Sequence, residues 1–203
     1  MKSNVEETNA NSDAAENERN LIRQAKEGHQ WAFTQLVSLY QKPLFRMAYG
    51  FFRDKDDAME IVQDAFLRVY RKIEGFDETD PRAQFKNWVY RIAHNLCIDH
   101  YRKYKKQKAE MSDIFQHNED IRGDSGSPEE AVDRETFREN LKLSVLRLPN
   151  RQKSVFTLKH YDGLKHHEIA EILNLSVGTV KSLYHRAIQN LKKHLVPESV
   201  AVG

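Results

Sequence analysis

Hydrogen-bond donors are concentrated on one face of a short segment near the C-terminus. Residues 177–187 read VGTVKSLYHRA, and the apolar positions Val180, Tyr184 and Ala187 recur at helical spacing. The opposite face of this helix carries Thr179, Lys181, Ser182, His185 and Arg186. Such side chains can donate to base edges and phosphates when a helix lies in the major groove of DNA. The segment therefore predicts a DNA-reading helix.

A shorter helix must position that reading helix. Residues 164–173 carry apolar side chains at Ile169, Ala170, Ile172 and Leu173, and Asn174-Leu175-Ser176 separates the two helices. Ser176 is a favourable N-cap because its hydroxyl can accept a hydrogen bond from an early backbone N–H of the second helix. Two helices joined by so short a turn are typical of a helix-turn-helix.

Composition limits the remaining possibilities. The chain has 203 residues, which allows one large or two small domains. Its net charge is only +2, so a positively charged surface for nucleic acid must be a local patch. Residues 100–108 contain basic side chains and no acid, and they are a candidate for that patch. The single cysteine, Cys97, excludes an internal disulfide and a cysteine-based metal cage. No apolar run is long enough to span a membrane and the N-terminus is polar, so we expect a cytoplasmic protein with no membrane insertion of its own.

Helical periodicity covers most of the chain, which predicts an all-α fold of two helical domains. Residues 1–17, rich in Asn, Glu, Ala and Ser, are predicted to be disordered. The first domain spans residues 18–108 and the second spans residues 128–196. Between them, residues 109–127 lose the periodicity and place Gly and Ser among acids, as a flexible linker does. Residues 127–130 (SPEE) predict the start of the second domain's first helix.

Within the first domain, two segments show a wide apolar stripe at helical spacing. The third helix is expected to begin at Asp54, and its stripe contains Ala58, Ile61, Val62, Ala65, Phe66, Val69 and Tyr70. The fourth helix is expected from about Ala83 to Lys106, with a stripe of Phe85, Trp88, Val89, Ile92, Ala93 and Leu96. In the preceding helical region, Pro43 is expected to kink or break the helix.

Three segments in this order resemble the motifs of the extracytoplasmic-function (ECF) sigma factors, which are small two-domain members of the bacterial sigma-70 family. Residues 56–70 (DDAMEIVQDAFLRVY) resemble region 2.2, and residues 85–96 (FKNWVYRIAHNL) resemble regions 2.3 and 2.4. Leu148-Pro149 with the helix-turn-helix resembles region 4. The resemblance covers residues 18–108 and 128–195.

The resemblance implies a transcription initiation factor and no enzyme, cofactor or metal. Such a protein binds core RNA polymerase, on the clamp helices of the large subunit, and directs it to promoter DNA. It recognises −35 and −10 elements and aids strand opening. The resemblance also leads us to expect an anti-sigma factor as a possible further partner.

By the same resemblance, three sets of residues take roles. The set implied for −35 DNA is Val177, Gly178, Thr179, Lys181, Ser182, His185 and Arg186. The set implied for the −10 element is Phe76, Asn87, Arg91, Asn95, Asp99, Arg102 and Lys103. The set implied for polymerase is Asp57, Glu60, Gln63, Asp64 and Arg68.

The residue types fit these roles, although each has a simpler interpretation. Asn and Arg at helical spacing can pair with base edges or phosphates, and capture of unpaired bases needs cations beside a stacking surface. The acidic face of the third helix could pair with cations of a partner helix, or it could merely be solvated. The basic end of the fourth helix could be a solvated end favoured by the helix dipole. Trp88 could belong to the core or stack on a base, and Glu168 could accept from a cytosine or cap its own helix.

Two other classes of protein fit the sequence less well. A stand-alone helix-turn-helix regulator would bind a symmetric operator, but it leaves residues 54–108 unexplained. A nucleic-acid enzyme such as a recombinase requires a clustered set of carboxylates or a nucleophile, which the sequence does not show. His167-Glu168-x-x-Glu171 departs from the zinc-protease pattern, since that pattern needs His where Glu171 stands.

Overall fold

The computed structural model describes residues 3–80, 83–112 and 131–195. These residues form helices and contain no strand, which confirms the prediction of an all-α fold. The elements are α1 (Ser3–Lys26), α2 (Gln30–Phe52), α3 (Lys55–Lys72), the 3-10 turn η1 (Ile73–Gly75), α4 (Phe85–Ser112), α5 (Ala131–Arg147), α6 (Asn150–His160), α7 (His166–Leu173) and α8 (Val177–Leu195). None of the helices in these ranges combines the length and apolarity that crossing a membrane requires.

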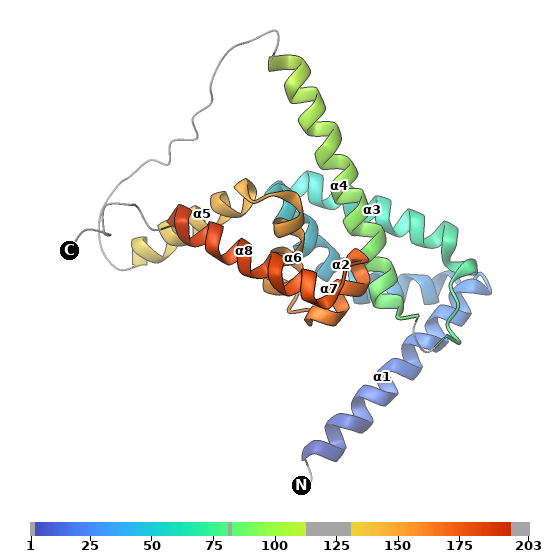
Figure 1. Cartoon of the computed structure of the whole chain (residues 1–203). Coiled ribbons are helices and arrows are strands. Elements are labelled where there is room, and N and C mark those ends of the chain that lie inside the picture. The colour runs from blue at the N-terminus through green and yellow to red at the C-terminus, as the bar shows by residue number, and fades with distance from the viewer. Residues whose placement is uncertain (1–2, 81–82, 113–130, 196–203) are drawn as a thin grey trace.

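Helices α1 to α4 form an N-terminal bundle around a core of aliphatic and aromatic side chains (Figure 1). Gly28 ends the α1–α2 turn with a φ of 88°, a conformation that favours glycine because it has no Cβ. Asp54 caps α3, and its Oδ1 accepts hydrogen bonds from the backbone N of Asp56 at 2.8 Å and of Asp57 at 2.9 Å. Aliphatic residues of the predicted α3 stripe, such as Ile61 and Val69, are buried as expected.

The structure differs from the sequence prediction at two helix boundaries. Helix α1 begins at Ser3, so residues 3–17, which were predicted to be disordered, are helical. Its Glu and Ala residues favour helix, and the packed segment around Ile22 supplies the nucleus from which the helix extends. Helix α4 continues to Ser112, into the predicted linker. Of the kink or break predicted at Pro43, the structure excludes the break, because α2 continues through this residue. The predicted helix start at 127–130 lies outside the described residues.

Helices α5 to α8 form the C-terminal half of the described chain. A second apolar cluster holds α5, α6 and α8 together through Val145, Leu148, Phe156, Ala187 and Leu191. Asn174 adopts the left-handed conformation at the end of α7, with a φ of 53°, and turns the chain into α8. Helices α7 and α8 therefore form the predicted helix-turn-helix.

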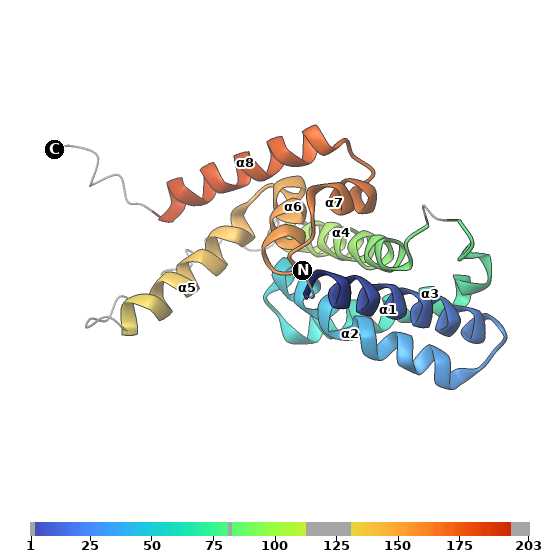
Figure 2. The same cartoon turned by 90° about the horizontal axis from the view of Figure 1, so that it is seen from below.

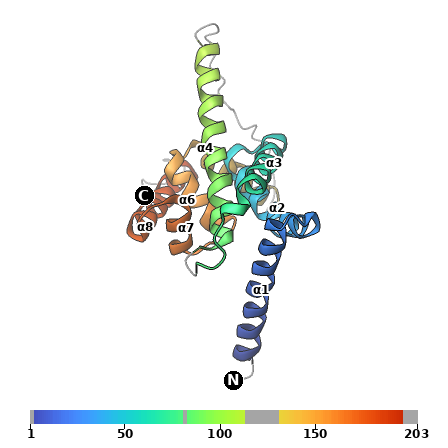
Figure 3. The same ribbon diagram turned by 90° about the vertical axis from the view of Figure 1, so that its right-hand side faces the viewer.

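The two halves pack against each other, which the sequence did not predict. Helix α7 contacts α4, and α6 contacts α2, so the main apolar core continues from the bundle into α6 and α7. Figures 2 and 3 show α7 beside α4. Figures 1 and 3 show the first part of α1 and the last part of α4 projecting from the body in opposite directions.

Candidate nucleic-acid and polymerase interfaces

The donor-rich face of α8 is exposed to solvent. Val180, Ala187 and Leu191 are buried on the opposite side, as the spacing predicted, and Tyr184 is half-buried against them. Ser176 caps the helix, because its Oγ accepts a hydrogen bond from Thr179 N at 3.1 Å. The exposed side chains are those assigned to −35 DNA: Val177, Thr179, Lys181, Ser182, His185 and Arg186, with Gly178 between them.

The stripe of α4 assigned to the −10 element faces the C-terminal half of the same chain. Asn87 is 3% exposed, and its Nδ2 donates to Glu171 Oε2 of α7 at 2.6 Å. One turn later, Arg91 Nη2 donates to the backbone oxygen of Glu171, also at 2.6 Å. The beginning of this stripe is therefore occupied by α7.

A polar cleft continues along the same face of α4. Asn95, Asp99 and Arg102 line it from the bundle side, and residues of α6 and of the α7–α8 turn line the opposite wall. Arg68 of α3 lies in this cleft as well, beside the residues assigned to −10 DNA. At the cleft, Arg102 lies 3.8 Å from Asp99 in an exposed ion pair, and the neighbouring Lys103 is exposed.

Phe76 lies in an aromatic cluster and not on the surface of its loop. Its ring is 5.2 Å from that of Phe85 and 5.1 Å from that of Trp88, measured between centroids, and the residue is 7% exposed. Lys26 holds the loop by donating to the carbonyl oxygen of Phe76 at 2.8 Å and to Glu78 at 2.6 Å. In this arrangement Phe76 has no free face on which a base could stack, whereas Trp88 is half-buried.

Glu168 acts as a helix cap and as an ion-pair partner. Its Oε2 accepts from Lys165 N at 2.6 Å, which completes the first turn of α7. Its Oε1 lies 2.8 Å from Lys86 Nζ of α4. Burial opposes ionisation of this carboxyl, but the bonds from Lys86 and from the Lys165 amide outweigh it, so the pKa of Glu168 is lowered.

The outward face of α3 combines charged and apolar side chains. Glu60, Gln63, Asp64 and Arg68 are exposed and Asp57 is half-exposed. Tyr70 is 54% exposed, so its prediction as part of the inward stripe is wrong. The residue lies at the last turn of α3, where its ring contacts Phe33 of α2 but is otherwise left uncovered by that helix. Met59 and Leu67 are also exposed, and together with α2 they line an apolar groove. Neither residue belongs to the predicted inward stripe, and that position outside the stripe is the sequence signal for their exposure.

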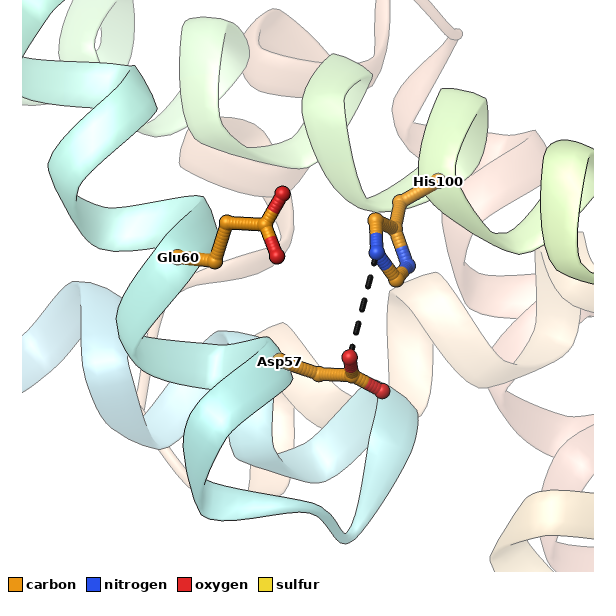
Figure 4. A group of neighbouring side chains, drawn as sticks. All are labelled: Asp57, Glu60 and His100. Atoms are coloured by element: carbon orange, nitrogen blue, oxygen red, sulfur yellow. Dashed lines mark ion pairs between the residues drawn. The ribbon is translucent and has the colours of Figure 1, made fainter.

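One group on α3 and α4 has the composition of a metal site. Asp57, Glu60 and His100 each place a potential ligand atom within 4.8 Å of the others (Figure 4). His100 Nε2 lies 3.8 Å from Asp57 Oδ1, and its ring packs edge-on against Phe52 at 5.0 Å. An ion pair between His100 and Asp57 accounts for this arrangement, with Glu60 exposed beside it.

Comparisons with known proteins match both halves of the chain. The model of sigma-70 region 2 matches residues 36–107, and that of sigma-70 region 4 matches residues 138–191. The chain is 36% identical over 180 residues to the ECF RNA polymerase sigma factor SigW of Bacillus subtilis, covering 86% of this chain and 94% of SigW. It is 28% identical to the RNA polymerase sigma-H factor of Pseudomonas aeruginosa, over 90% of this chain and 95% of that protein.

A solved structure has the same arrangement of helices. CnrH, in complex with the cytosolic domain of CnrY, aligns with a TM-score of 0.63 and 27% identity, over 87% of this chain and 95% of CnrH. This alignment spans both halves of the described chain.

Proposed function

Because this chain belongs to the ECF sigma factors of the sigma-70 family, we propose that it binds core RNA polymerase and directs it to specific promoters. The match to region 2 overturns the rival hypothesis of a stand-alone regulator, since such a regulator needs no region 2. In this role the chain supplies recognition and strand capture, while the polymerase supplies the chemistry.

One observation supports this proposal most strongly: the chain carries two chemically different exposed faces on separate helices. The face of α8 offers cations and hydroxyls, which suit phosphates and base edges. The face of α3 offers carboxylates, an amide and exposed apolar side chains, which suit a basic protein partner. A DNA ligand would be repelled by the acids of α3, so two partners explain the faces better than one.

We assign the roles by half. The bundle ending in α4 is the proposed region 2 unit, in which Asp57, Glu60, Gln63 and Asp64 bind the polymerase and the α4 stripe reads the −10 element. The half that begins in α5 is the proposed region 4 unit, in which α8 reads the −35 element. Arg68 shares a cleft with Asn95 and Asp99, so DNA is its proposed partner in place of polymerase.

An anti-sigma factor is a further proposed partner. The relative CnrH was solved with the cytosolic domain of CnrY, and this chain aligns over most of CnrH. The apolar groove between α2 and α3 offers an exposed surface on which such a protein could pack.

In vitro transcription tests the proposed function directly. Purified core polymerase is given genomic fragments with and without this protein, and RNA 5′ ends are mapped. New start sites that share paired −35 and −10 elements are the expected result. No new start, together with a footprint of the protein alone on a symmetric site, would contradict the proposal.

A further inference from the structure

We infer that Asp57, Glu60 and His100 form a binding site for one divalent transition-metal ion of the zinc type, and that the bound ion weakens the contact of α3 with core polymerase. The first part stands on the geometry and chemistry of the three side chains. The second part rests on the proposed function, because it needs Asp57 and Glu60 to bind the polymerase. The ion and the polymerase then compete for the same two carboxylates.

The three side chains converge on one space between α3 and α4. Asp57 and Glu60 stand three positions apart on α3, so they project from neighbouring points on the same side of that helix. His100 enters from α4, and one ligand atom from each of the three residues lies within 4.8 Å of the other two. Figure 4 shows both carboxylates and the imidazole ring directed toward this space. Among the described residues, no other group of three His, Cys, Asp or Glu side chains is so close together.

The separation of the ligand atoms is near to what a bound ion requires. Zinc lies about 2.0–2.2 Å from imidazole nitrogen and carboxylate oxygen, so the ligand atoms of a tetrahedral site are roughly 3.4 Å apart. The present atoms reach that spacing if they approach one another by about 1.4 Å. Glu60 is exposed, so rotation about its side-chain bonds supplies this movement without disturbing the core.

The fold leaves negative charge in this group without a basic partner. His100 Nε2 lies 3.8 Å from Asp57 Oδ1, and this ion pair leaves Glu60 with no Lys or Arg partner among the described residues. Asp64 follows Glu60 by four positions and adds a third carboxylate to the same face. Like charges three and four residues apart on a helix repel each other, so a bound cation relieves this repulsion.

The donor set selects the class of ion. An imidazole nitrogen with two carboxylate oxygens suits zinc and its neighbours in the first transition series, whereas magnesium and calcium prefer oxygen ligands alone. Three protein ligands leave a further position for water, as in open zinc sites. Cys97 is fully buried in the core of the bundle, so its thiol does not enter the set.

The surroundings hold the group in place and keep it accessible. The His100 ring packs edge-on against Phe52, with 5.0 Å between the ring centroids. The side chain of His100 is 27% exposed and that of Asp57 is 39% exposed, so an ion can reach them from solvent while the helices shelter one side. All three ligands stand on helices, which fix the positions of ligands better than loops do.

A bound ion changes the charge of the proposed polymerase face. Asp57 and Glu60 are two of its acids, and the double positive charge of the ion cancels both carboxylates. Attraction for a basic partner then falls, because charge complementarity across the interface is lost. Zinc should therefore lower the affinity for core polymerase, and it should do so only in chains that retain His100.

Isothermal titration calorimetry of the untagged full-length chain with zinc chloride measures the binding. The wild type should bind one ion per chain, and magnesium chloride at the same concentration should not displace it. His100→Phe removes one ligand and keeps an aromatic ring beside Phe52, and Glu60→Gln removes a charge with little change in shape. Each variant should lower the zinc affinity at least about tenfold, because even the outer-shell partners of metal ligands contribute this much.

Two matched variants distinguish coordination from general attraction of cations. Asp56→Asn removes a carboxylate from the first turn of α3 without removing a ligand of the group. His167→Phe removes an exposed imidazole from α7. Both should bind zinc as the wild type does. Equal losses of affinity in Asp56→Asn and Glu60→Gln would show that the acids merely attract cations, and would overturn the site.

NMR of the imidazole nitrogens in the wild-type chain locates the ion without any substitution. One equivalent of zinc should shift the resonances of His100 and leave those of the other histidines unchanged. This measurement decides the question if a variant fails to fold. No saturable binding by the wild type, or binding that leaves the His100 resonances in place, would overturn the inferred site.

Surface plasmon resonance on immobilised core polymerase, with and without zinc, tests the second part. Zinc should lower the affinity of the wild type at least about fivefold, because two carboxylates are withdrawn from the interface. His100→Phe should bind the polymerase as the zinc-free wild type does, with or without zinc. Zinc binding at His100 without a change in polymerase affinity would overturn the competition alone. Absence of polymerase binding by the zinc-free wild type would contradict the proposed function, while calorimetry and NMR would still decide the metal site.

Discussion

At the scale of single residues, the interface between the halves contains buried ionisable groups. Burial raises the pKa of Asp162 to about 7, although Arg46 and Lys86 oppose this effect. Arg46 Nε of α2 lies 3.5 Å from Asp162 Oδ1, and Tyr90 of α4 is also close enough to interact with this carboxyl. Burial lowers the pKa of Lys153 to about 8 and that of His94 to about 4. These groups determine how the stability of the fold responds to pH.

Asp162→Asn should make the protein more resistant to unfolding at high pH. The folded chain holds the Asp162 proton more tightly than the unfolded chain, so this residue's contribution to stability falls as the pH rises from about 4 to about 7. The Asn variant cannot lose that proton. Its free energy of unfolding minus that of the wild type should therefore rise across this window, by up to about 4 kcal/mol.

Urea unfolding followed by circular dichroism at pH 4.5, 6 and 7.5 measures this difference. The difference between the two proteins is the informative quantity, because His94 affects both in the opposite direction: its lowered pKa adds stability as the pH rises from about 4 to 6.5. A difference that does not change with pH would show that Asp162 is ionised throughout.

At the scale of secondary-structure elements, three helices each present one functional face. Helix α8 presents donors to solvent, and α3 presents acids with exposed apolar side chains. Helix α4 presents a polar stripe whose first residues, Asn87 and Arg91, contact α7. Because each face belongs to a different helix, substitutions should separate the proposed activities.

Arg186→Ala should weaken binding to −35 duplex about tenfold without changing affinity for core polymerase, because loss of a base or phosphate contact costs roughly 1–3 kcal/mol. Electrophoretic mobility shift on −35 duplex and a pull-down of core polymerase measure the two activities. Lys192→Ala, also exposed but about four turns from the start of α8, is the control. Equal loss of both activities would refute the division of roles.

Asp64→Ala should produce the reverse pattern. Removing a carboxylate at a charged protein interface should weaken polymerase binding roughly fivefold, with a larger loss at low salt. Surface plasmon resonance on immobilised core polymerase measures the affinity, and Glu74→Ala, exposed in η1, is the control. Unchanged affinity at low salt would refute the role of Asp64.

At the scale of the whole molecule, the two halves share one continuous core in the free chain. Val155 and Leu158 of α6 and Ile169 of α7 belong to the same buried cluster as the bundle. Units that share buried apolar surface lose it together, so their unfolding is coupled.

Differential scanning calorimetry checks this coupling. The wild-type chain should unfold in one transition or in two that overlap. Gly50→Ala should show two resolved transitions, because a Cβ on Gly50 of α2 would lie 2.6 Å from Thr157 Cγ2 of α6 and so disrupt the apolar surface that the halves share. Identical thermograms for the two proteins would mean that the contact between α2 and α6 contributes no coupling.

Much of the fold and of the candidate site could be predicted from local patterns. The 3.6-residue period, the helix start at Asp54 and the cap at Ser176 depend on neighbours in the chain, so the sequence identified α3 and α8. The exposed face of α8 follows from the same period, because its apolar positions define the buried side. The α1 start was not predictable by composition, since its polar residues suit either disorder or a helix extended from a packed segment.

The sequence alone determined the helices, the order of the two halves and the family to which they belong. Only the tertiary structure decided which faces remain available. Asn87 and Arg91 have the same local pattern whether they meet DNA or Glu171, and Phe76 has the same loop sequence whether its ring is free or packed on Trp88. Periodicity specifies which side of a helix is polar, but the partner of that side depends on contacts between residues about 80 positions apart.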